Sequence, residues 1–502
     1  MSAIPQQQLS ALSDLVARWT GLYFPPERHA ELERGLVRAS KDFGHPNVGS
    51  FVNFCLTTAE LTPDQVQTLA WHLTIGETYF LRGRQTFEVL EREVLPQFIM
   101  ARRNDEQQLR LWSAGCAGGE EPYSLAITVS RVLPESQDWN VTILATDINT
   151  RALHKASEGV YGSWSFRDTP DWLRPHFFRE AGNGEWAIRP EIKRRVTFSY
   201  LNLAADPYPS LATNTNAMDI IFCRNVLMYF RAETMKRVIG RLHDALRDGG
   251  YLFVAPSEAS HEFFPQFERV AVNGEIYYRK DAAHAHGHGA AHAHPARRLR
   301  PAVVPKAEPA APRRAHAGGD GHKPRPVPAK AAPERRAAHR QIAREPAAAA
   351  VQHRVASQAS HEAAASAAQA AALAAAARAA ANEGRLSEAL ADCEEAIRID
   401  KLSADYRYLY ATILAELDRQ DDAVKALNST LYLDPHFVLA HFLYGNIARR
   451  RSRPGEAESH FRATLTLLEE LSPDDVLPES EGMTAGKLAE IVKSILQLEA
   501  AS

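Results

Sequence analysis

The chain has 502 residues, of which 45% are hydrophobic and 24% charged, and its formal net charge is −3. This length exceeds one hydrophobic core and predicts about three domains. The balanced charge gives no indication of a nucleic acid partner. No apolar run approaches the roughly 20 residues that a membrane-spanning helix needs, and the N-terminus does not resemble a secretory signal. We therefore expect a cytoplasmic protein without membrane insertion.

The cysteines exclude two further classes of protein. They are far apart and form no CxxC pair, so we expect buried thiols rather than a disulfide framework or a cysteine zinc site. They are Cys55, Cys116, Cys223 and Cys393.

Residues 1–80 are predicted to form a small helical domain. Apolar residues recur at helical spacing, and Pro25-Pro26 and Gly44-His45-Pro46 interrupt the pattern. The apolar positions are Leu9, Leu12, Leu15, Val16, Leu32, Leu36 and Val37. Basic residues also recur in this region, at Arg28, Arg34, Arg38 and Lys41. They indicate either a docking face or a solvated surface shared with acids such as Glu27 and Glu31.

Residues 81–280 are predicted to form an α/β domain with a mostly parallel, Rossmann-like sheet. Strand-like runs alternate with helical stretches, which is typical of this class. The runs are LRLWSAG at 109–115, VTILATDI at 141–148, DIIFCRN at 219–225 and GYLFVAP at 250–256.

A glycine-rich turn at residues 115–119 leads directly into Glu120-Glu121-Pro122. Two carboxylates at this place would repel the phosphates of a dinucleotide and attract a cationic ligand. Asp147 ends the next strand, where an acid can accept hydrogen bonds from ribose hydroxyls. S-adenosylmethionine, which has a sulfonium, an ammonium and no phosphate, satisfies both features. The alternatives are helix N-terminal charge complementarity for Glu120 and a helix cap, before Thr150, for Asp147.

Residues 281–360 are rich in Ala, Pro, His and Arg and are predicted to form a disordered linker, because such a segment buries too little apolar surface. Its basic residues indicate a solvated tether or, alternatively, contact with an acidic surface. Without a fixed scaffold, its histidines are not expected to form a metal site. The basic residues include Arg297, Arg298, Arg313, Arg314, Arg335 and Arg336, and the histidines are His284, His286, His288, His292 and His294.

Residues 361–502 are predicted to form an all-α array of tetratricopeptide-like repeats. Ala389, Ala423 and Ala457 recur every 34 residues, the period of that repeat. An apolar residue follows each of them four positions later, at Cys393, Leu427 and Phe461, and Pro435 and Gly445 fit the pattern in one unit. Such arrays usually bind a protein partner, although a structural or oligomerising role is the alternative.

Five blocks of the chain strongly resemble the CheR-type chemoreceptor glutamate methyltransferases. They occur in the family's order and cover roughly residues 10 to 280. The blocks are TIGETYFLR at 74–82, LWSAGCAGGEEPYSLA at 111–126, ATDINTRALHKASEGVY at 145–161, FSYLNL at 198–203 and DIIFCRNVLMYF at 219–230. The resemblance implies S-adenosylmethionine as methyl donor, no metal, a small antiparallel subdomain near residues 175–200, and a chemoreceptor cytoplasmic domain as partner.

The resemblance also implies site residues. The expected cofactor-binding residues are Gly76, Thr78, Arg82, Glu120, Glu121, Asp147, Asn202, Leu203, Arg224 and Asn225. Either Glu120 or Glu121 meets the cofactor's ammonium, and the register of the motif favours Glu121. Arg82 is the first catalytic candidate, for orienting the acceptor carboxylate, and Tyr229 is the second, either by hydrogen bonding or by lining the methyl-transfer pocket. The alternatives are a salt bridge from Arg82 to Glu120 or Glu121 and ordinary packing for Tyr229.

Three positions depart from the family's pattern. Gly76 replaces a common Asn, Leu81 replaces a Phe, and Ala255-Pro256-Ser257-Glu258 replaces GHSE. The first and third motivate an alternative function, a catalytically impaired cofactor-binding scaffold that acts through its repeats. A small-molecule carboxyl methyltransferase is a second alternative. The short turn at Gly182-Asn183-Gly184 predicts that a receptor's C-terminal tether is not used and that the repeats contribute targeting or regulation instead.

Overall fold

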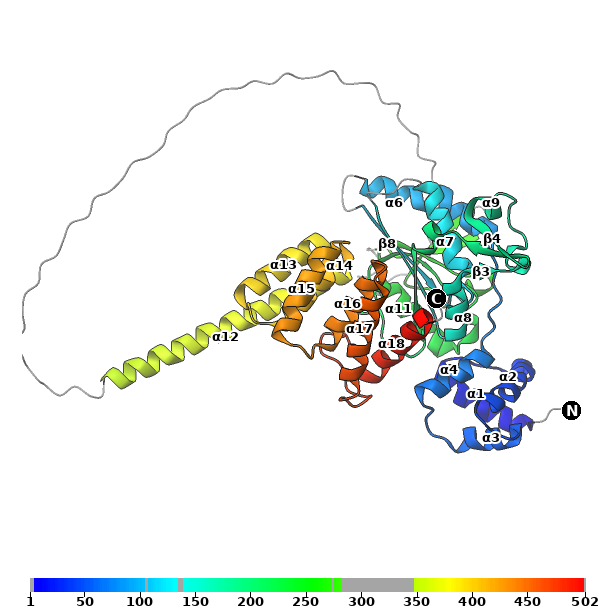
Figure 1. The fold of residues 1–502 in the computed structure, drawn as a ribbon, viewed down its shortest axis with the longest axis horizontal. Helices are drawn as coiled ribbons and strands as arrows, with labels where there is room; N and C mark the ends of the chain where they lie inside the picture. The colour runs from blue at the N-terminus through cyan, green and yellow to red at the C-terminus, as the bar shows by residue number, and fades with distance from the viewer. Residues whose placement is uncertain (1–3, 104–106, 134–138, 273–274, 282–346, 501–502) are drawn as a thin grey trace, which may run out of the picture. The chain divides into compact units, whose positions relative to one another are not determined.

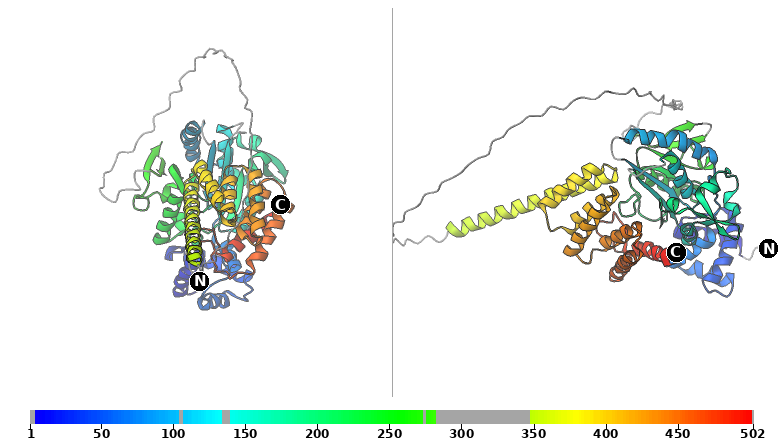
Figure 2. Two further views of the ribbon diagram at one scale, coloured as in Figure 1. Left: turned by 90° about the vertical axis from the view of Figure 1, so that its left-hand side faces the viewer. Right: turned by 45° about the horizontal axis from the view of Figure 1, so that its top comes forward.

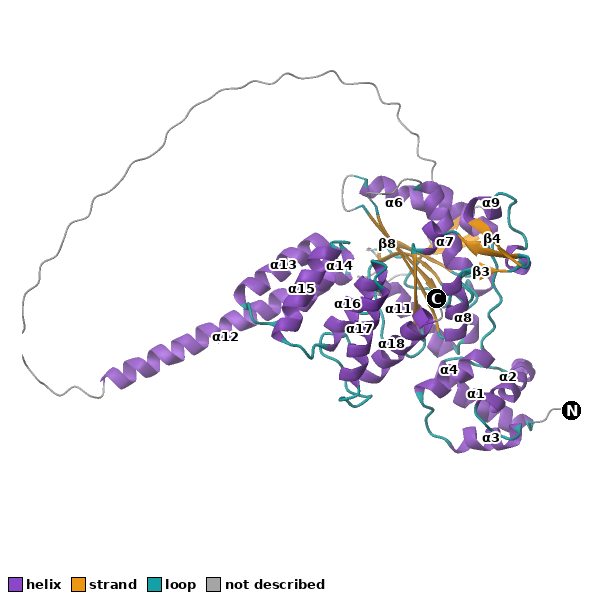
Figure 3. Cartoon of the chain, viewed as in Figure 1, coloured by secondary structure: helices purple, strands orange, loops and turns teal. Residues whose placement is uncertain are grey.

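The computed structural model describes residues 4–103, 107–133, 139–272, 275–281 and 347–500, and the side chains of all of these except 347–363 and 498–500. Strands are confined to the central region, whereas the N-terminal and C-terminal regions consist of helices and loops (Figure 1, Figure 3). The two regions Met1–Arg298 and Ala367–Ser502 belong to one compact unit. The predicted histidines 284–294 and the arginines 297–336 lie outside the described residues.

Four helices form the N-terminal region, as predicted. They are α1 (Gln6–Thr20), α2 (His29–Asp42), α3 (Val48–Thr57) and α4 (Pro63–Leu73), with the short 3-10 helix η1 (Pro26–Arg28). Leu12, Val16 and Leu32 are fully buried in their common core. Val37, which shares the predicted helical spacing, is 38% exposed and is not part of this core. Its side chain lies on the outer face of α2, beside Arg34 and Arg38, which are also exposed.

The central region contains a seven-stranded sheet in the order β6-β2-β1-β7-β8-β10-β9. The first five are parallel, and β10 is antiparallel to both β8 and β9. The chain therefore reverses its winding direction beside β1, which is where ligands bind in Rossmann-like sheets. The strands are β1 (Gln108–Ala114), β2 (Asn140–Asp147), β6 (Val196–Tyr200), β7 (Met218–Phe222), β8 (Leu246–Phe253), β9 (Glu268–Val272) and β10 (Glu275–Arg279).

Helices cover this sheet and the connections between its strands. They are α5 (Arg84–Val89), the π-helix η2 (Leu90–Val94), α6 (Leu95–Arg102), α7 (Glu120–Val132), α8 (Thr150–Glu158), η3 (Ser163–Phe166), α9 (Leu173–Phe177), α10 (Pro190–Lys193), η4 (Leu227–Tyr229), α11 (Ala232–Ala245) and η5 (Pro256–Glu258). β1 is buried along its whole length, as expected for a strand covered on both faces.

The small antiparallel subdomain is present but begins earlier than expected. Its three strands, in the order β3-β5-β4, are β3 (Val160–Tyr161), β4 (Phe178–Gly182) and β5 (Glu185–Ile188). Gly182-Asn183-Gly184 joins β4 to β5, and all three residues have positive φ angles, between 53° and 88°. Residues 196–200 form β6 of the main sheet rather than part of this subdomain.

The C-terminal region is a series of helices in which each packs on the next (Figure 2). They are α12 (Ala347–Asn382), α13 (Leu386–Ile399), α14 (Ala404–Glu416), α15 (Gln420–Leu433), α16 (Val438–Arg450), α17 (Pro454–Leu468) and α18 (Ala485–Ala500). Helix α12 begins within the range predicted as linker, because its alanine-rich sequence has the highest helix propensity. The repeat positions Ala389, Ala423 and Ala457 are fully buried, and so are Cys393, Leu427 and Phe461.

The array packs against the edge of the main sheet. Helix α18 contacts β6, and two side chains of the sheet, Gln108 and Asn140, donate hydrogen bonds of 2.9 and 2.8 Å to the carbonyl oxygen of Glu416. Among the residues that the structure describes, no helix is long and apolar enough to cross a membrane. All four cysteines are buried free thiols, as predicted.

Candidate active site

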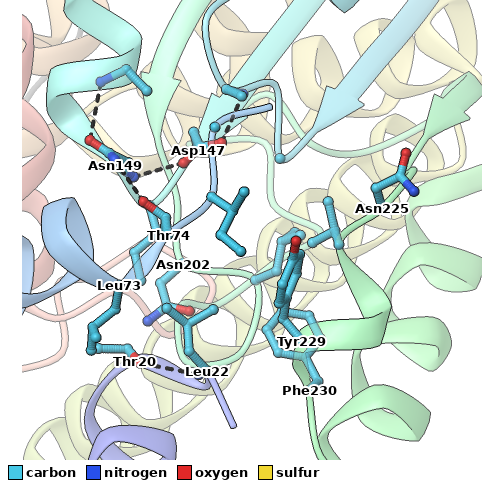
Figure 4. A pocket seen from close by; sticks show the side chains of 18 of the residues that line it. Thr20, Leu22, Leu73, Thr74, Asp147, Asn149, Asn202, Asn225, Tyr229 and Phe230 are labelled. Atoms are coloured by element: carbon cyan, nitrogen blue, oxygen red, sulfur yellow. Dashed lines mark hydrogen bonds between the residues drawn. The ribbon is translucent and has the colours of Figure 1, made fainter. Parts of the chain in front are cut away.

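A cavity lies at the carboxyl ends of β1, β2, β6 and β7 (Figure 4). Six predicted site residues line it: Gly76, Asp147, Asn202, Leu203, Asn225 and Tyr229. The other predicted residues, Thr78, Arg82, Glu120, Glu121 and Arg224, lie outside its wall. The parallel strands therefore bring sequence-distant blocks together, as the motif order predicted.

Asp147 ends β2 and is held by the backbone around the cavity. Its carboxylate accepts hydrogen bonds from the backbone N–H groups of Ala117, at 2.9 Å, and Asn149, at 2.8 Å. Burial raises its pKa, and these hydrogen bonds oppose that effect. The helix cap of α8 is Asn149, whose side chain accepts from the backbone of Ala152. The alternative role of Asp147 as that cap is therefore wrong.

The glycine-rich turn between β1 and α7 requires glycine at both ends. Gly115 and Gly119 have φ angles of 84° and 91°. A Cβ on Gly115 would lie 2.4 Å from the Val226 side chain, and one on Gly119 would lie 2.7 Å from the Ala156 side chain. The turn thus lets the backbone of residue 117 reach Asp147 and line the cavity.

Glu120 is buried behind this turn. One of its carboxylate oxygens accepts a 2.8 Å hydrogen bond from the Ser165 hydroxyl, and the other has no hydrogen-bond partner among the described residues. Burial raises the pKa of Glu120, and the Ser165 hydrogen bond opposes the rise. A buried carboxylate oxygen without a partner has spare capacity to accept a hydrogen bond.

Glu121 connects the glycine turn to Arg224. It accepts a 2.8 Å hydrogen bond from the Ser113 hydroxyl and lies 3.4 Å from the Arg224 guanidinium. Burial raises the pKa of Glu121, and the Arg224 charge lowers it. The same guanidinium donates to the Arg82 carbonyl oxygen at 2.7 Å. Glu121 and Arg224 therefore position the backbone of Arg82 from outside the cavity.

The Arg82 side chain donates a 2.7 Å hydrogen bond to the carbonyl oxygen of Glu77. Within the described part of the chain it forms no ion pair, so the alternative salt bridge to Glu120 or Glu121 is absent. The Arg82 charge lowers the pKa of both Glu121 and Tyr229, so both groups are within its electrostatic influence. A half-buried guanidinium without a carboxylate partner is available to an anionic acceptor.

The sequence analysis named Glu258 only as the end of the altered segment 255–258 and not as a site residue, yet Glu258 fixes the loop that carries Asn225 and Tyr229. Its carboxylate accepts hydrogen bonds from the backbone N–H groups of Asn225, Val226 and Met228, at 2.8 to 3.2 Å, and of Ala255, at 3.0 Å. Asn225 has a φ of 59°, a left-handed conformation that asparagine tolerates well. The altered residues before Glu258 therefore leave this loop anchored.

The N-terminal region supplies the opposite wall, through Thr20, Leu22, Leu73 and Thr74. Asn149 donates a 2.7 Å hydrogen bond to the Thr74 hydroxyl, which ties this wall to the end of β2. Thr20, Leu22 and Leu73 lie outside every matched block, so little in the sequence indicated them, whereas Thr74 begins the first block.

Tyr229 lies at the rim between the two walls. The Arg28 guanidinium lies 4.8 Å from the centre of its ring, and burial raises the pKa of its hydroxyl. Tyr229 lines the cavity and also packs against the core of the N-terminal region, so the pocket-lining role and ordinary packing both apply to it.

Asn202 links the cavity to the repeat array. Its backbone N–H donates a 2.6 Å hydrogen bond to Asp206, and Asp206 lies 3.0 Å from the Lys487 ammonium on α18. The array therefore contacts a group that positions a residue of the cavity wall.

These residues fit S-adenosylmethionine. Asp147 offers carboxylate acceptors for ribose hydroxyls, and Leu203, Ile148 and Phe230 offer apolar walls for adenine. Glu120 offers an unused buried acceptor near the glycine turn, which suits an ammonium donor. No group of three His, Cys, Asp or Glu side chains that could hold a metal occurs within the described residues.

Comparison with known proteins identifies the same region. Residues 76–274 match the family model "CheR methyltransferase, SAM binding domain". The chain is 38% identical over 212 residues to chemotaxis protein methyltransferase 1 of Pseudomonas aeruginosa, covering 41% of this chain and 74% of that protein. It is 34% identical over 210 residues to a chemotaxis protein methyltransferase of Vibrio parahaemolyticus, covering 41% and 73% respectively. A chemotaxis protein methyltransferase of Borreliella burgdorferi is 29% identical over 258 residues, with 51% and 89% covered.

Proposed function

Because the chain belongs to the CheR family of S-adenosylmethionine-dependent chemotaxis methyltransferases, we propose that it esterifies glutamate side chains of a chemoreceptor. S-adenosylmethionine is its methyl donor, and the sulfonium supplies an activated methyl group. The chain's own residues then have to bind this donor, exclude water and align an acceptor oxygen with the methyl carbon.

The composition of the cavity wall supports a glutamate carboxylate as the methyl acceptor. None of its described residues is a histidine, lysine or cysteine, and its one acid, Asp147, is already engaged by backbone N–H groups. An alcohol or amine acceptor would need a general base, whereas a glutamate carboxylate is ionised at neutral pH. Positioning then supplies the rate enhancement, for which about 7 to 11 kcal/mol is available in favourable cases.

Arg82 is proposed as the group that orients the acceptor carboxylate. Its planar guanidinium suits a bidentate carboxylate, and its backbone is held by Arg224. Tyr229 is proposed to line the path of methyl transfer from the opposite rim. Thr78 and Gly76 are proposed to contribute cofactor contacts through the segment that precedes Arg82.

The cavity rim favours a protein acceptor over a small molecule. Three large apolar side chains near it are exposed: Ile75 at 51%, Met228 at 52% and Trp164 at 68%. The Arg167 guanidinium lies over the rings of Tyr79 and Trp164, at 4.1 and 4.4 Å. Exposed apolar and cationic groups around a cavity are typical of a protein interaction surface.

The exposed face of α2 is proposed as part of the same docking surface. Arg34, Arg38 and Lys41 are exposed there, spaced at three to four residues along one helix face. A glutamate-bearing receptor helix would complement this charge. Arg28 instead pairs with Glu31 and Tyr229 and belongs to the rim.

The array is proposed to contribute targeting or regulation. A chain that lacks residues 360–502 should still bind S-adenosylmethionine while its rate of receptor methylation or the regulation of that rate changes. An unchanged rate and unchanged regulation would contradict this role. The residues around the active-site cavity do not support the alternative of a catalytically impaired cofactor-binding scaffold. Gly76 still lines the cavity, and Glu258 still anchors the loop that carries Asn225.

The acceptor assignment is tested by peptide mapping. A purified receptor cytoplasmic fragment would be incubated with the full chain and S-adenosylmethionine, and its peptides would be sequenced by mass spectrometry. Methyl groups on glutamate side chains would support the proposal. Methylation of other side chains alone would contradict it.

A further inference from the structure

A second, larger cavity lies between the edge of the main sheet and the repeat array. It encloses about 400 Å³, which is within the range of small-molecule sites. Residues 140–144 of β2 and two residues of β6 form one side, and helices α14, α16 and α18 form the other. The first and middle residues of β2 line this second cavity, whereas the carboxyl end of the same strand lines the active-site cavity.

The charge of this second cavity is strongly positive. Five arginines line it, and the acids among its described lining residues are Glu416 and Asp418. The arginines are Arg110, Arg194, Arg195, Arg449 and Arg450. Like charges gathered in one cavity repel one another and are stabilised by an anion between them.

Two of these arginines, Arg195 and Arg450, have no hydrogen-bond or ion-pair partner within the described residues, although the charges of Asp418 and Glu416 act on Arg450. Burial lowers the pKa of both guanidinium groups, yet Arg450 retains a large exposed area. A side chain that is surrounded by protein and still exposed faces a cavity rather than the outer surface. Arg450 lines the cavity, so its guanidinium donors are available to a ligand there.

The neighbouring Arg110–Glu416 pair also has unused hydrogen-bonding capacity. The two charged groups lie 3.7 Å apart, and Arg110 donates to oxygens of Asn214 and Asn216. However, Arg110 Nε and Glu416 Oε1 are buried without a hydrogen-bond partner among the described groups. Buried polar atoms are rarely left in this state, so a water or a ligand completes the site.

The remaining lining restricts the kind of anion. Trp139, Phe442, Ile491 and Ile495 give the cavity an apolar part, and Glu416 Oε1 requires a donor. A ligand with phosphates for the arginines, a ring system for the apolar part and hydroxyl or amino donors meets all three conditions.

We propose that this cavity binds a nucleotide, and that the bound nucleotide fastens the repeat array to the catalytic sheet. The arginines come from both sides, Arg195 from the sheet and Arg450 from α16. A phosphate held by both is a link between the array and the strands that carry Asp147 and Asn202 at their ends.

The test is calorimetric titration of the full chain, saturated with S-adenosylmethionine so that the active-site cavity is filled. The probes are ATP, AMP, adenosine and inorganic pyrophosphate. We expect ATP or AMP to bind, adenosine to bind at least tenfold more weakly, and Arg450→Gln and Arg195→Gln each to weaken nucleotide binding at least tenfold. Arg462→Gln, an exposed arginine that pairs with Glu458 elsewhere on the array, is the matched control and should bind like the unchanged chain.

Several outcomes would overturn the proposal. The first is no binding by any probe, and the second is nucleotide binding that is unaffected in both cavity variants. The third is pyrophosphate binding as tight as nucleotide binding, because that result would indicate a site for inorganic anions. A polyglutamate peptide that binds in an Arg450-dependent manner, when nucleotides do not, would replace the nucleotide by an acidic protein segment. Circular dichroism of each variant separates a lost contact from a lost fold.

Discussion

Strand β2 contributes to two cavities of opposite charge. Its carboxyl end places Asp147 in a cavity that suits a cationic nucleoside, and outside the cavity wall lie the buried Glu120 and the partly buried Glu121. Its residues 140–144 line a cavity with five arginines, which suits an anion. The same strand therefore supports opposite electrostatics, because each cavity takes its charge from the segments around the strand rather than from the strand itself.

The two cavities also differ in how well their residues can be predicted from the sequence. Apart from Thr20, Leu22 and Leu73, the residues that line the acidic cavity lie in five contiguous motif blocks, so glycine spacing and strand ends located many of them. The basic cavity joins Arg110, Arg195 and Arg450, which belong to no common motif. Because the two cavities differ in charge and should bind different ligands, a change in one can be measured separately from a change in the other.

Asp147→Asn is expected to have the largest effect, on the acidic cavity alone. Hydrogen bonds to a charged group contribute about 1.5 to 3 kcal/mol, so the Kd for S-adenosylmethionine should rise about 10- to 100-fold. Calorimetric titration measures this, with the exposed Asp171→Asn as the control. An unchanged Kd would remove Asp147 from the cofactor site.

Arg82→Ala should lower turnover by at least about tenfold, because a charge-assisted contact to the acceptor carboxylate is lost. Initial methylation rates at saturating S-adenosylmethionine measure the effect. Arg84→Ala is the matched control, since Arg84 is exposed and, within the described part of the chain, pairs with Glu88. If turnover stays at the level of the unchanged chain, Arg82 has no part in the mechanism.

Gly445→Ala should affect the basic cavity without affecting the acidic one. A Cβ at this position in α16 would lie 2.7 Å from the Phe461 ring, and such overpacking costs about 1 to 3 kcal/mol. We expect a lower Tm and weaker anion binding, since Arg450 is on the same helix, with the affinity for S-adenosylmethionine retained. Gly455→Ala meets no atom within 4 Å and should leave both properties unchanged. Equal Tm values for the two variants would contradict this packing.

Acidification should move the two affinities in opposite directions. Burial raises the pKa of Asp147 and Glu121, so protonation begins at a higher pH than in a free carboxyl and weakens binding of a cation. Burial also raises the pKa of Glu416, and its protonation leaves the basic cavity more positive. Each protonation changes an affinity by at most about tenfold per pH unit.

Titrations from pH 7 downward, with S-adenosylmethionine and with inorganic sulfate as an anion that stays doubly charged, measure the two trends. We expect the first affinity to fall and the second to rise. If both affinities rise or both fall on acidification, the two cavities do not differ in charge in the way that the structure indicates.

Lys487→Met should have the smallest effect. The Lys487 ammonium holds Asp206, which accepts the backbone N–H of Asn202, so its loss should weaken S-adenosylmethionine binding about two- to fivefold. Lys493→Met on the exposed side of the same helix is the control. Identical affinities in the two variants would show that the array does not influence the cofactor cavity.

Much of the fold could be predicted from the sequence, for identifiable reasons. The buried strands appear as continuous apolar runs, and the 34-residue period of Ala389, Ala423 and Ala457 results from close helix packing. Val37 fits the helical spacing yet is exposed, because spacing alone does not distinguish a core position from the edge of an apolar face. The start of α12 was missed because alanine-rich composition is shared by helices and unstructured linkers.

The site was predicted less completely than the fold. Asp147 and Asn202 were found because strand ends converge at one edge of a parallel sheet. Thr20 and Leu22 were missed because they reach the cavity through tertiary packing of a separate helical region. Glu258 was missed because its role is to accept backbone hydrogen bonds from a loop more than 25 residues away in sequence, which no local pattern reveals.

The central claim is tested most directly by transfer of radiolabelled methyl from S-adenosylmethionine to membranes that contain candidate chemoreceptors, followed by mild alkaline hydrolysis. The account predicts base-released volatile methanol, which identifies carboxyl methyl esters, and a loss of at least about tenfold with Arg82→Ala. Label that is transferred but resists base, or no transfer to any receptor despite bound S-adenosylmethionine, would contradict it.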